Sequence, residues 1–206
     1  MQPATEPEDP SVTDQRRDVA RAGHVGDAAT ARLGLSDPAP GVRSTALGAL
    51  ERLGSLGDDE LADGLGDGDP AVRRRAAELT ATHPGVVLLP ALDDPDPSVV
   101  EMAAWAAGER EEVAAVDRLA RMATGDTGHA DPLCREAAVA ALGAIGDPAG
   151  LPAVLAALDD KPAIRRRAAV ALAAFEGPEV EAALQRCLDD RDWQVRQVAE
   201  DLLAID

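Results

Sequence analysis

Apolar residues recur along the chain at the spacing of an α-helix. Counted from an apolar residue that follows a proline-containing turn (position 0), positions 0, +4 and +8 form one stripe. These stripes read Val42/Ala46/Leu50, Cys134/Ala138/Leu142, Ile164/Ala168/Leu172 and Val195/Ala199/Leu203. An Asp-Pro pair before such a stripe favours a helix start, because proline fits the first turn and aspartate accepts unpaired backbone N–H groups. The pattern therefore predicts a series of helices, each beginning at such a turn.

The same frame occurs six times, which indicates an internal repeat. Position 0 recurs at intervals of 27 to 35 residues, at Val42, Val72, Val99, Cys134, Ile164 and Val195, with a weaker copy at Val12. A second mark, Leu-x-Asp, precedes five of the turns, with its aspartate at Asp37, Asp67, Asp94, Asp160 and Asp190. Another helical pattern precedes the turns, as in Leu151, Val154, Leu155 and Leu158. Each unit is thus predicted to hold two helices, helix A before the turn and helix B after it.

Position +4 is alanine in all six units, which predicts that helix backbones approach closely there. Residues 137–160, "AAVAALGAIGDPAGLPAVLAALDD", resemble HEAT repeats of the bilin-lyase (PBS lyase) type. The resemblance covers about residues 27–206. It implies a right-handed α-α superhelix, a HEAT-like solenoid of about six two-helix repeats whose B helices line the concave side. Proteins with such repeats include scaffolds, chromophore lyases, a DNA glycosylase group and a hydroxylase, so the resemblance predicts the fold more closely than the function.

Three segments are expected along the chain. Residues 1–12 are acidic and proline-rich and are expected to form a flexible acidic tail. Residues 13–25 are expected to form a degenerate N-terminal capping helix, because Arg16 stands at position +4. Residues 26–206 are expected to form the HEAT-like repeat domain. The longest interval contains an extended turn at residues 124–132, "TGDTGHADP".

The composition argues against several classes of partner. The 206 residues carry 38 acidic and 20 basic side chains other than histidine, a net charge of −18, so a general polyanion-binding surface is not expected and neither is a nucleic-acid partner. No apolar stretch is long enough to cross a membrane, and the N-terminus lacks a signal-peptide core, so a cytoplasmic protein without a membrane partner is expected. Cys134 and Cys187 are isolated and are expected to be buried thiols.

Arginine occupies position +1 in five of the six units. Because a helix dipole favours an acid in the first turn, these arginines need another partner. We expect each to form a bidentate pair with a turn aspartate, within its unit or in the next one, as a structural ladder. The ladder arginines are Arg43, Arg73, Arg135, Arg165 and Arg196.

Positions +2 and +6 point away from the apolar stripe and supply the candidate partner-binding residues. Position +2 holds Arg74 and Arg166, as well as Glu101 and Glu136, whereas position +6 holds Trp105, Ala140 and Val170 in the middle units. We expect these seven residues to lie on the concave face. Alternatively, the two arginines are solvated surface charges, and the side chain of Trp105 folds over its own neighbours and fills space. Trp193, at the usual proline position of the last unit, is expected to pack as a terminal cap.

No constellation of catalytic, cofactor-binding or metal-binding residues stands out. His24, His83 and His129 lie in unrelated frames and none is followed by glutamate, so the paired metal ligands of the HEAT-like hydroxylase are missing. The sequence therefore predicts a non-catalytic scaffold or adaptor that needs no cofactor and binds a protein partner. A bilin-lyase-like chromophore lyase or lyase subunit is the alternative, and a HEAT-like DNA glycosylase is a weaker one.

Overall fold

The computed structural model describes residues 10–125 and 127–204, and these residues form helices, turns and loops without β-strands. The chain divides into two compact units, Met1–Val86 (unit 1) and Val87–Asp206 (unit 2). The fold class is all-α, a solenoid built from two-helix repeats, as the sequence predicts.

Unit 1 contains the B helices α3 and α5 and a preceding helix, α1. Its elements are α1 (Pro10–Val25), α2 (Ala28–Leu33), η1 (Gly34–Ser36), α3 (Pro40–Arg52), α4 (Asp58–Leu65), α5 (Pro70–Leu79) and η2 (Thr80–Thr82). The helix α3 packs against both α1 and α5, so these three helices form one layer. The helices α2 and α4 cover that layer as the A helices of their repeats.

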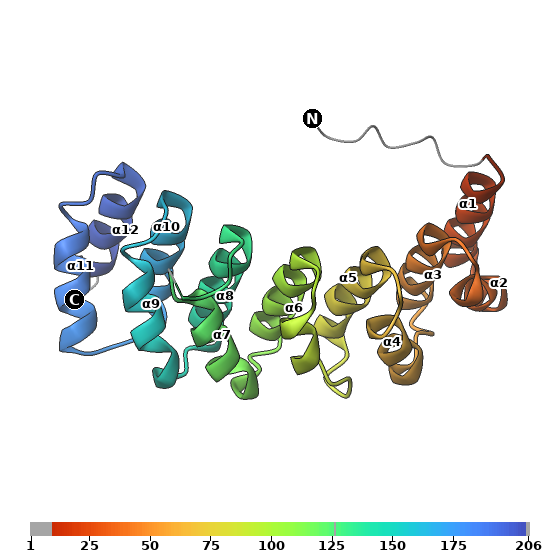
Figure 1. Ribbon diagram of the computed structural model, residues 1–206, viewed down its shortest axis with the longest axis horizontal. Helices are drawn as coiled ribbons and strands as arrows, with labels where there is room; N and C mark the ends of the chain where they lie inside the picture. Colours follow the sequence, from red (N-terminus) through yellow and green to blue (C-terminus); the bar gives the residue numbers. More distant parts are fainter. Residues whose placement is uncertain (1–9, 126, 205–206) are drawn as a thin grey trace. The chain divides into compact units, whose positions relative to one another are not determined.

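Unit 2 repeats this arrangement four times, with α6, α8, α10 and α12 as B helices (Figure 1). Its elements are η3 (Leu89–Asp93), α6 (Pro97–Glu109), η4 (Val113–Ala115), α7 (Val116–Ala123), α8 (Pro132–Ile145), η5 (Pro148–Gly150), α9 (Leu151–Ala157), α10 (Pro162–Ala171), η6 (Leu172–Ala174), α11 (Pro178–Cys187) and α12 (Trp193–Leu203). The helix α8 packs between α6 and α10, and α10 also packs against α12.

The Asp-Pro turns start the B helices as the sequence predicts. Asp69, Asp96, Asp131 and Asp192 are N-caps whose side chains accept a backbone N–H from two residues further on. Proline occupies the first helical position of α3, α5, α6, α8 and α10, where its missing N–H has no helical partner to lose. The helix α1 also begins at a proline, Pro10, so residues 10–12 are helical and the predicted tail boundary at residue 12 is wrong. Residues 1–9 of that tail lie outside the described residues.

The alanines at position +4 lie where helices A and B meet. All six, from Ala46 to Ala199, are completely buried. A Cβ placed on Gly34 would lie 3.0 Å from the Cβ of Ala46, and one on Gly64 would lie 3.1 Å from the Cβ of Ala76. Small residues on both helices therefore permit this close approach.

The third repeat departs from the two-helix prediction. Its helix A is reduced to the short 3₁₀ helix η3, which begins at Leu89. The interval between Val72 and Val99, which contains η3, is the shortest between repeats. Pro90 stands in the first turn of η3, which ends at Asp93 without extending into an α-helix. The remaining residues thus bury Leu88 and Leu92 without a full α-helix.

Bidentate arginine–aspartate pairs join successive repeats inside each unit. The Nε and Nη2 atoms of Arg43 both donate to the carboxylate of Asp67 at 2.7 Å. Arg135 binds Asp160 in the same way at 2.8 and 3.0 Å, and Arg165 binds Asp190 at 3.0 and 3.1 Å. Each pair joins the first turn of one helix B to the turn that precedes the next helix B.

The third nitrogen of each ladder arginine binds the arginine's own turn. Nη1 donates to a backbone carbonyl five or six residues earlier in all five cases, including Arg73, which contacts the carbonyl of Asp67, and Arg196, which contacts that of Asp190. The paired carboxylates also accept backbone N–H groups of their turns. Hydrogen bonds from the arginines lower the pKa of Asp67, Asp160 and Asp190 below the ordinary value of 3.8. The carboxylates are therefore charged at neutral pH and fixed on several sides.

We predict that Arg165→Ala lowers the free energy of unfolding by about 1–3 kcal/mol, because it leaves the carboxylate of Asp190 largely buried without its charged partner. Urea unfolding followed by circular dichroism measures the change. Arg186→Ala, an exposed arginine on α11, is the matched control. An equal effect of the two substitutions would show that the pair does not stabilise the repeat junction.

His83 links two repeats of unit 1. Its Nε2 lies 2.7 Å from Glu51 at the end of α3, and its Nδ1 lies 3.1 Å from Asp58 at the start of α4. Burial of the ring opposes protonation, but the hydrogen bonds to Glu51 and Asp58 outweigh it and raise the pKa of His83 above 6.5. The protonated imidazole is thus the form that the folded state favours.

We predict that the stability contributed by the His83 link decreases as the pH rises. Because the folded-state pKa is raised, the contribution of His83 is fully present below pH 6.5 and is lost as the pH rises through the folded-state pKa. Thermal unfolding of the wild type and His83→Gln between pH 5.5 and about 8.5 tests this, with His24→Gln, an exposed histidine on α1, as the control. The difference in melting temperature between the wild type and His83→Gln should shrink with rising pH. A constant difference would contradict the prediction.

Candidate functional site

The candidate residues at position +6 of unit 2 lie on three adjacent B helices. Trp105 is on α6, Ala140 on α8 and Val170 on α10, and α8 packs between the other two. Trp105 is 43% exposed and Val170 49%, whereas Ala140 is partly buried. Two large apolar side chains at the surface thus flank a helix whose corresponding residue is small.

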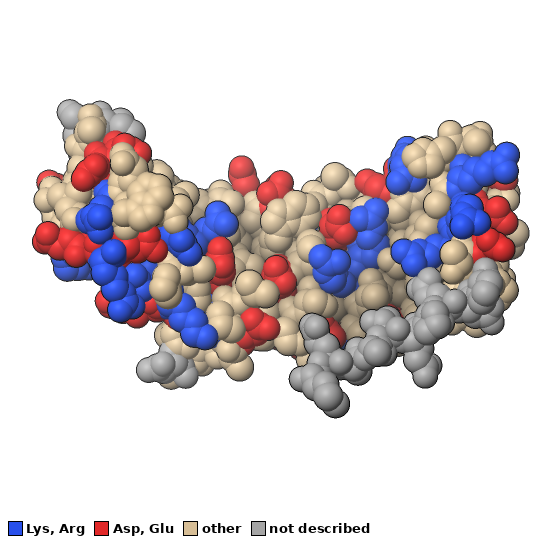
Figure 2. Space-filling model, turned by 90° about the horizontal axis from the view of Figure 1, so that it is seen from above, with Lys and Arg blue, Asp and Glu red and all other residues tan. Residues whose placement is uncertain are grey.

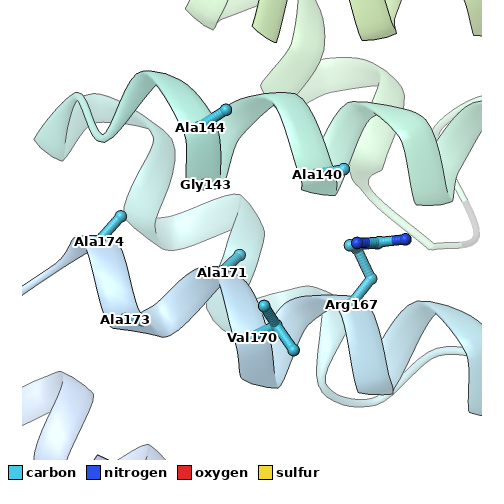
Figure 3. A pocket seen from close by; sticks show the side chains of 8 residues that line it. All are labelled: Ala140, Gly143, Ala144, Arg167, Val170, Ala171, Ala173 and Ala174. Atoms are coloured by element: carbon cyan, nitrogen blue, oxygen red, sulfur yellow. The ribbon is translucent and has the colours of Figure 1, made fainter. Parts of the chain in front are cut away.

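A shallow apolar groove runs between α8 and α10 beside Ala140 (Figure 3). It has a volume of about 360 Å³ and is lined by Ala140, Gly143, Ala144, Arg167, Val170, Ala171, Ala173 and Ala174. Gly143 lies at a close approach of the two helices, since a Cβ added there would be 2.7 Å from the Cβ of Ala171. The groove exists because small side chains leave the space between the two helices unfilled.

Charged side chains meet the groove at one end. Arg167 and Val170 also line a neighbouring depression of about 300 Å³, together with Glu136, Ala163 and Arg166. Figure 3 shows the side chain of Arg167 extending from α10 toward α8, beside Val170. Arg167 is not among the candidate residues predicted from the sequence, because its contact with the groove depends on the packing of two helices.

The arginines at this end are held less closely than those of the ladder. Arg167 lies 3.6 Å from Glu136, and Arg166 lies 3.7 Å from Asp192 while it donates to the side chain of Gln194. The side chains of Arg166 and Arg167 are 40% and 46% exposed. Glu101, one turn before Trp105 on α6, is partly exposed. All six candidate residues of unit 2 therefore reach the surface to some degree.

Arg74, the seventh candidate residue, belongs to unit 1 and is exposed on α5. Its neighbour Arg75 pairs with Glu78 at 2.8 Å and lies over Gly48 of α3, where an added Cβ would be 2.5 Å from Nη2 of Arg75. Position +6 of unit 1 thus holds a covered glycine and a paired glutamate. The exposed apolar residues found at this position in unit 2 have no counterpart in unit 1.

Trp193 does not pack as the sequence predicts. Its side chain is 64% exposed at the first position of α12. The N-cap Asp192 directs the backbone into the helix, and the residues that follow, Val195 and Ala199, form the buried stripe instead. The expectation of a packed terminal cap is therefore wrong.

The cysteines and histidines form no evident reaction centre. Cys134 and Cys187 are buried free thiols, and burial raises the pKa of Cys134 to about 11, which disfavours the nucleophilic thiolate. His129 accepts a backbone N–H from Asp131 within the long turn. Across residues 10–125 and 127–204, no group of three His, Cys, Asp or Glu side chains could hold a metal ion. The same residues include no helix with the length and hydropathy needed to span a bilayer.

Acidic and basic side chains are interspersed on the face of the protein that Figure 2 shows. Figure 2 shows blue and red side chains close together in both units, with tan areas between them. Several of the arginines form pairs with carboxylates, as in Arg32 with Glu60 and Arg118 with Asp93. The face in view carries no continuous basic field of the kind that binds a polyanion.

A family model for HEAT repeats matches the chain over residues 59–128 and 126–204, more than half of its length. The chain is a HEAT-repeat protein. The matching family is HEAT repeats in general, so the bilin-lyase subtype stays a prediction. A comparison with curated proteins finds no match.

Solved structures with a similar fold include designed armadillo repeat proteins. A designed armadillo repeat protein in complex with the peptide (KR)4 is 17% identical, with 97% of this chain and 95% of that chain covered and a TM-score of 0.62. The E. coli protein YibA is also 17% identical, with 99% and 77% covered and a TM-score of 0.62. Computationally designed armadillo repeat proteins for modular peptide recognition give 16% identity, 95% and 94% coverage and a TM-score of 0.51. These likenesses concern the fold of the HEAT-repeat protein alone.

Proposed function

We propose that this HEAT-repeat protein is a non-catalytic scaffold or adaptor that binds a protein partner through the B-helix face of unit 2. The observation that carries the proposal is the pair of exposed apolar side chains, Trp105 and Val170, on either side of α8. Solvation of large apolar side chains is unfavourable, and tryptophan is enriched among residues that dominate binding energy. A partner that covers this surface would remove both side chains from water.

The shape of the face supports the same function. A groove about 360 Å³ in volume with a floor of alanine and glycine gives a partner's side chains access to apolar surface near the backbone. The designed armadillo proteins of similar fold are described as recognising peptides, which fits a peptide-like segment as the partner. The two cysteines are buried and unpaired, which fits our further expectation that the protein acts in a reducing compartment such as the cytoplasm.

We predict that Trp105→Ala weakens partner binding by about tenfold or more while the melting temperature changes little, because the removed side chain is already half in solvent. Partners captured by the full-length wild type are identified by mass spectrometry, purified and titrated against each variant.

The matched control is Trp193→Ala, which removes an exposed tryptophan from another part of unit 2. Its affinity for the same partner should stay close to that of the wild type. A large fall in the melting temperature of Trp105→Ala would show that Trp105 mainly packs against its neighbours. Equal affinities for Trp105→Ala and the wild type would contradict the proposed surface.

A further inference from the structure

We propose that the groove between α8 and α10 selects a partner segment that carries a large apolar side chain next to a carboxylate. The apolar side chain occupies the groove, and the carboxylate binds Arg167 at its end. This inference rests on the proposed function and adds the chemistry of the partner.

The groove itself favours an apolar side chain. Seven of its eight lining residues are alanine, glycine or valine, and Arg167 is the one charged residue among them. Its volume of about 360 Å³ gives room for a large side chain, and without a partner the groove is open to water. An aliphatic or aromatic side chain displaces this water from apolar surface, whereas a polar side chain finds few hydrogen-bonding partners there.

Arg167 favours a carboxylate beside that apolar side chain. Its guanidinium carries five N–H donors, and the nearest carboxylate among the described residues, that of Glu136, lies 3.6 Å away, beyond a good hydrogen bond. The ladder shows what arginines in this chain form when a carboxylate is well placed, namely two parallel bonds of 2.7 to 3.1 Å. With its side chain 46% exposed, Arg167 can offer the same geometry to an incoming acidic residue.

The net charge of −18 favours a basic partner at long range but does not decide the contact at the groove. At physiological ionic strength, exposed charges more than about 8 Å apart are largely screened from each other. A lysine or arginine next to the apolar side chain would approach Arg167, the charged residue that lines the groove. The local charge thus favours an acidic residue there.

A random dodecapeptide library displayed on phage and selected on the full-length protein at 150 mM salt tests this partner chemistry. We expect enriched sequences to place an aspartate or glutamate within a few positions of Leu, Ile, Phe or Trp. A synthetic peptide of the most enriched sequence, labelled with fluorescein, then gives dissociation constants for the wild type and the variants by fluorescence anisotropy.

Two variants, each with a matched control on α11, test separately how the groove and Arg167 contribute to peptide binding. Ala144→Leu fills the groove from an exposed position, and Ala182→Leu makes the same change on the exposed side of α11. Arg167→Glu reverses the charge at the groove, and Arg186→Glu does so on α11. We expect Ala144→Leu and Arg167→Glu to weaken binding about tenfold or more, whereas both α11 controls stay within about twofold of the wild type. The Arg167→Glu variant should bind a peptide whose acidic residues are replaced by lysine more tightly than it binds the original peptide.

Each other outcome has a distinct meaning. Enrichment of lysine- and arginine-rich peptides would overturn the inference and leave the proposed function standing, with Glu101 and Glu136 as the expected contacts. Acidic–apolar peptides that bind Ala144→Leu and Arg167→Glu as well as the wild type would also overturn it, because they would bind elsewhere. Failure of the folded protein to enrich any peptide would contradict the inference. The proposed function is tested separately by the Trp105→Ala titration with a captured partner.

Discussion

The arginine at position +1 joins the repeats inside each unit. A repeat protein has no single central core, so each repeat is stabilised mainly by its neighbours. One guanidinium binds the carbonyls of its own turn and, in three observed pairs, the aspartate of the next turn. The Arg135–Asp160 pair has side chains less than a tenth exposed, so losing either partner leaves a buried charge. This interaction joins α3 to the turn before α5, α8 to the turn before α10, and α10 to the turn before α12, whereas α6 carries Val100 at position +1 and packs against α8 without it.

The ladder and the apolar stripe use positions 0, +1, +4 and +8 of each helix B. The residues on the other face of the helix can therefore differ in type from one repeat to the next. Position +6 holds Gly48 beneath Arg75 in unit 1, but Trp105, Ala140 and Val170 in unit 2. Such variation changes the surface without removing a contact that joins repeats. The apolar residues at position +6 that are proposed to bind a partner are therefore distinct from those of the ladder and the stripe, and substitutions can test the two roles separately.

The repeat was predictable because helix starts, the buried alanine and the turn aspartate each recur at fixed positions. The short helix A of the third repeat was not predictable from the sequence. A short interval between repeats can result from a shorter loop or from a shorter helix, and the sequence pattern does not distinguish the two. The groove was also not predictable. It depends on Gly143 and Ala144 of α8 and on Ala173 and Ala174 of η6, the short helix that follows α10, which are small residues outside the repeat frame. The exposure of Trp193 likewise depends on the direction of one side chain at a helix start.

The ladder also changes what the acidic composition means for binding. Its arginines are directed toward turns and are largely buried, so their charges balance nearby aspartates and contribute little to an outer field. The exposed basic charge that remains, such as Arg167, is then locally significant in a protein of net charge −18. Long-range attraction affects the rate of encounter, whereas contacts at the interface decide which partner stays bound. A strongly acidic repeat protein can therefore hold an acidic residue of its partner at one arginine.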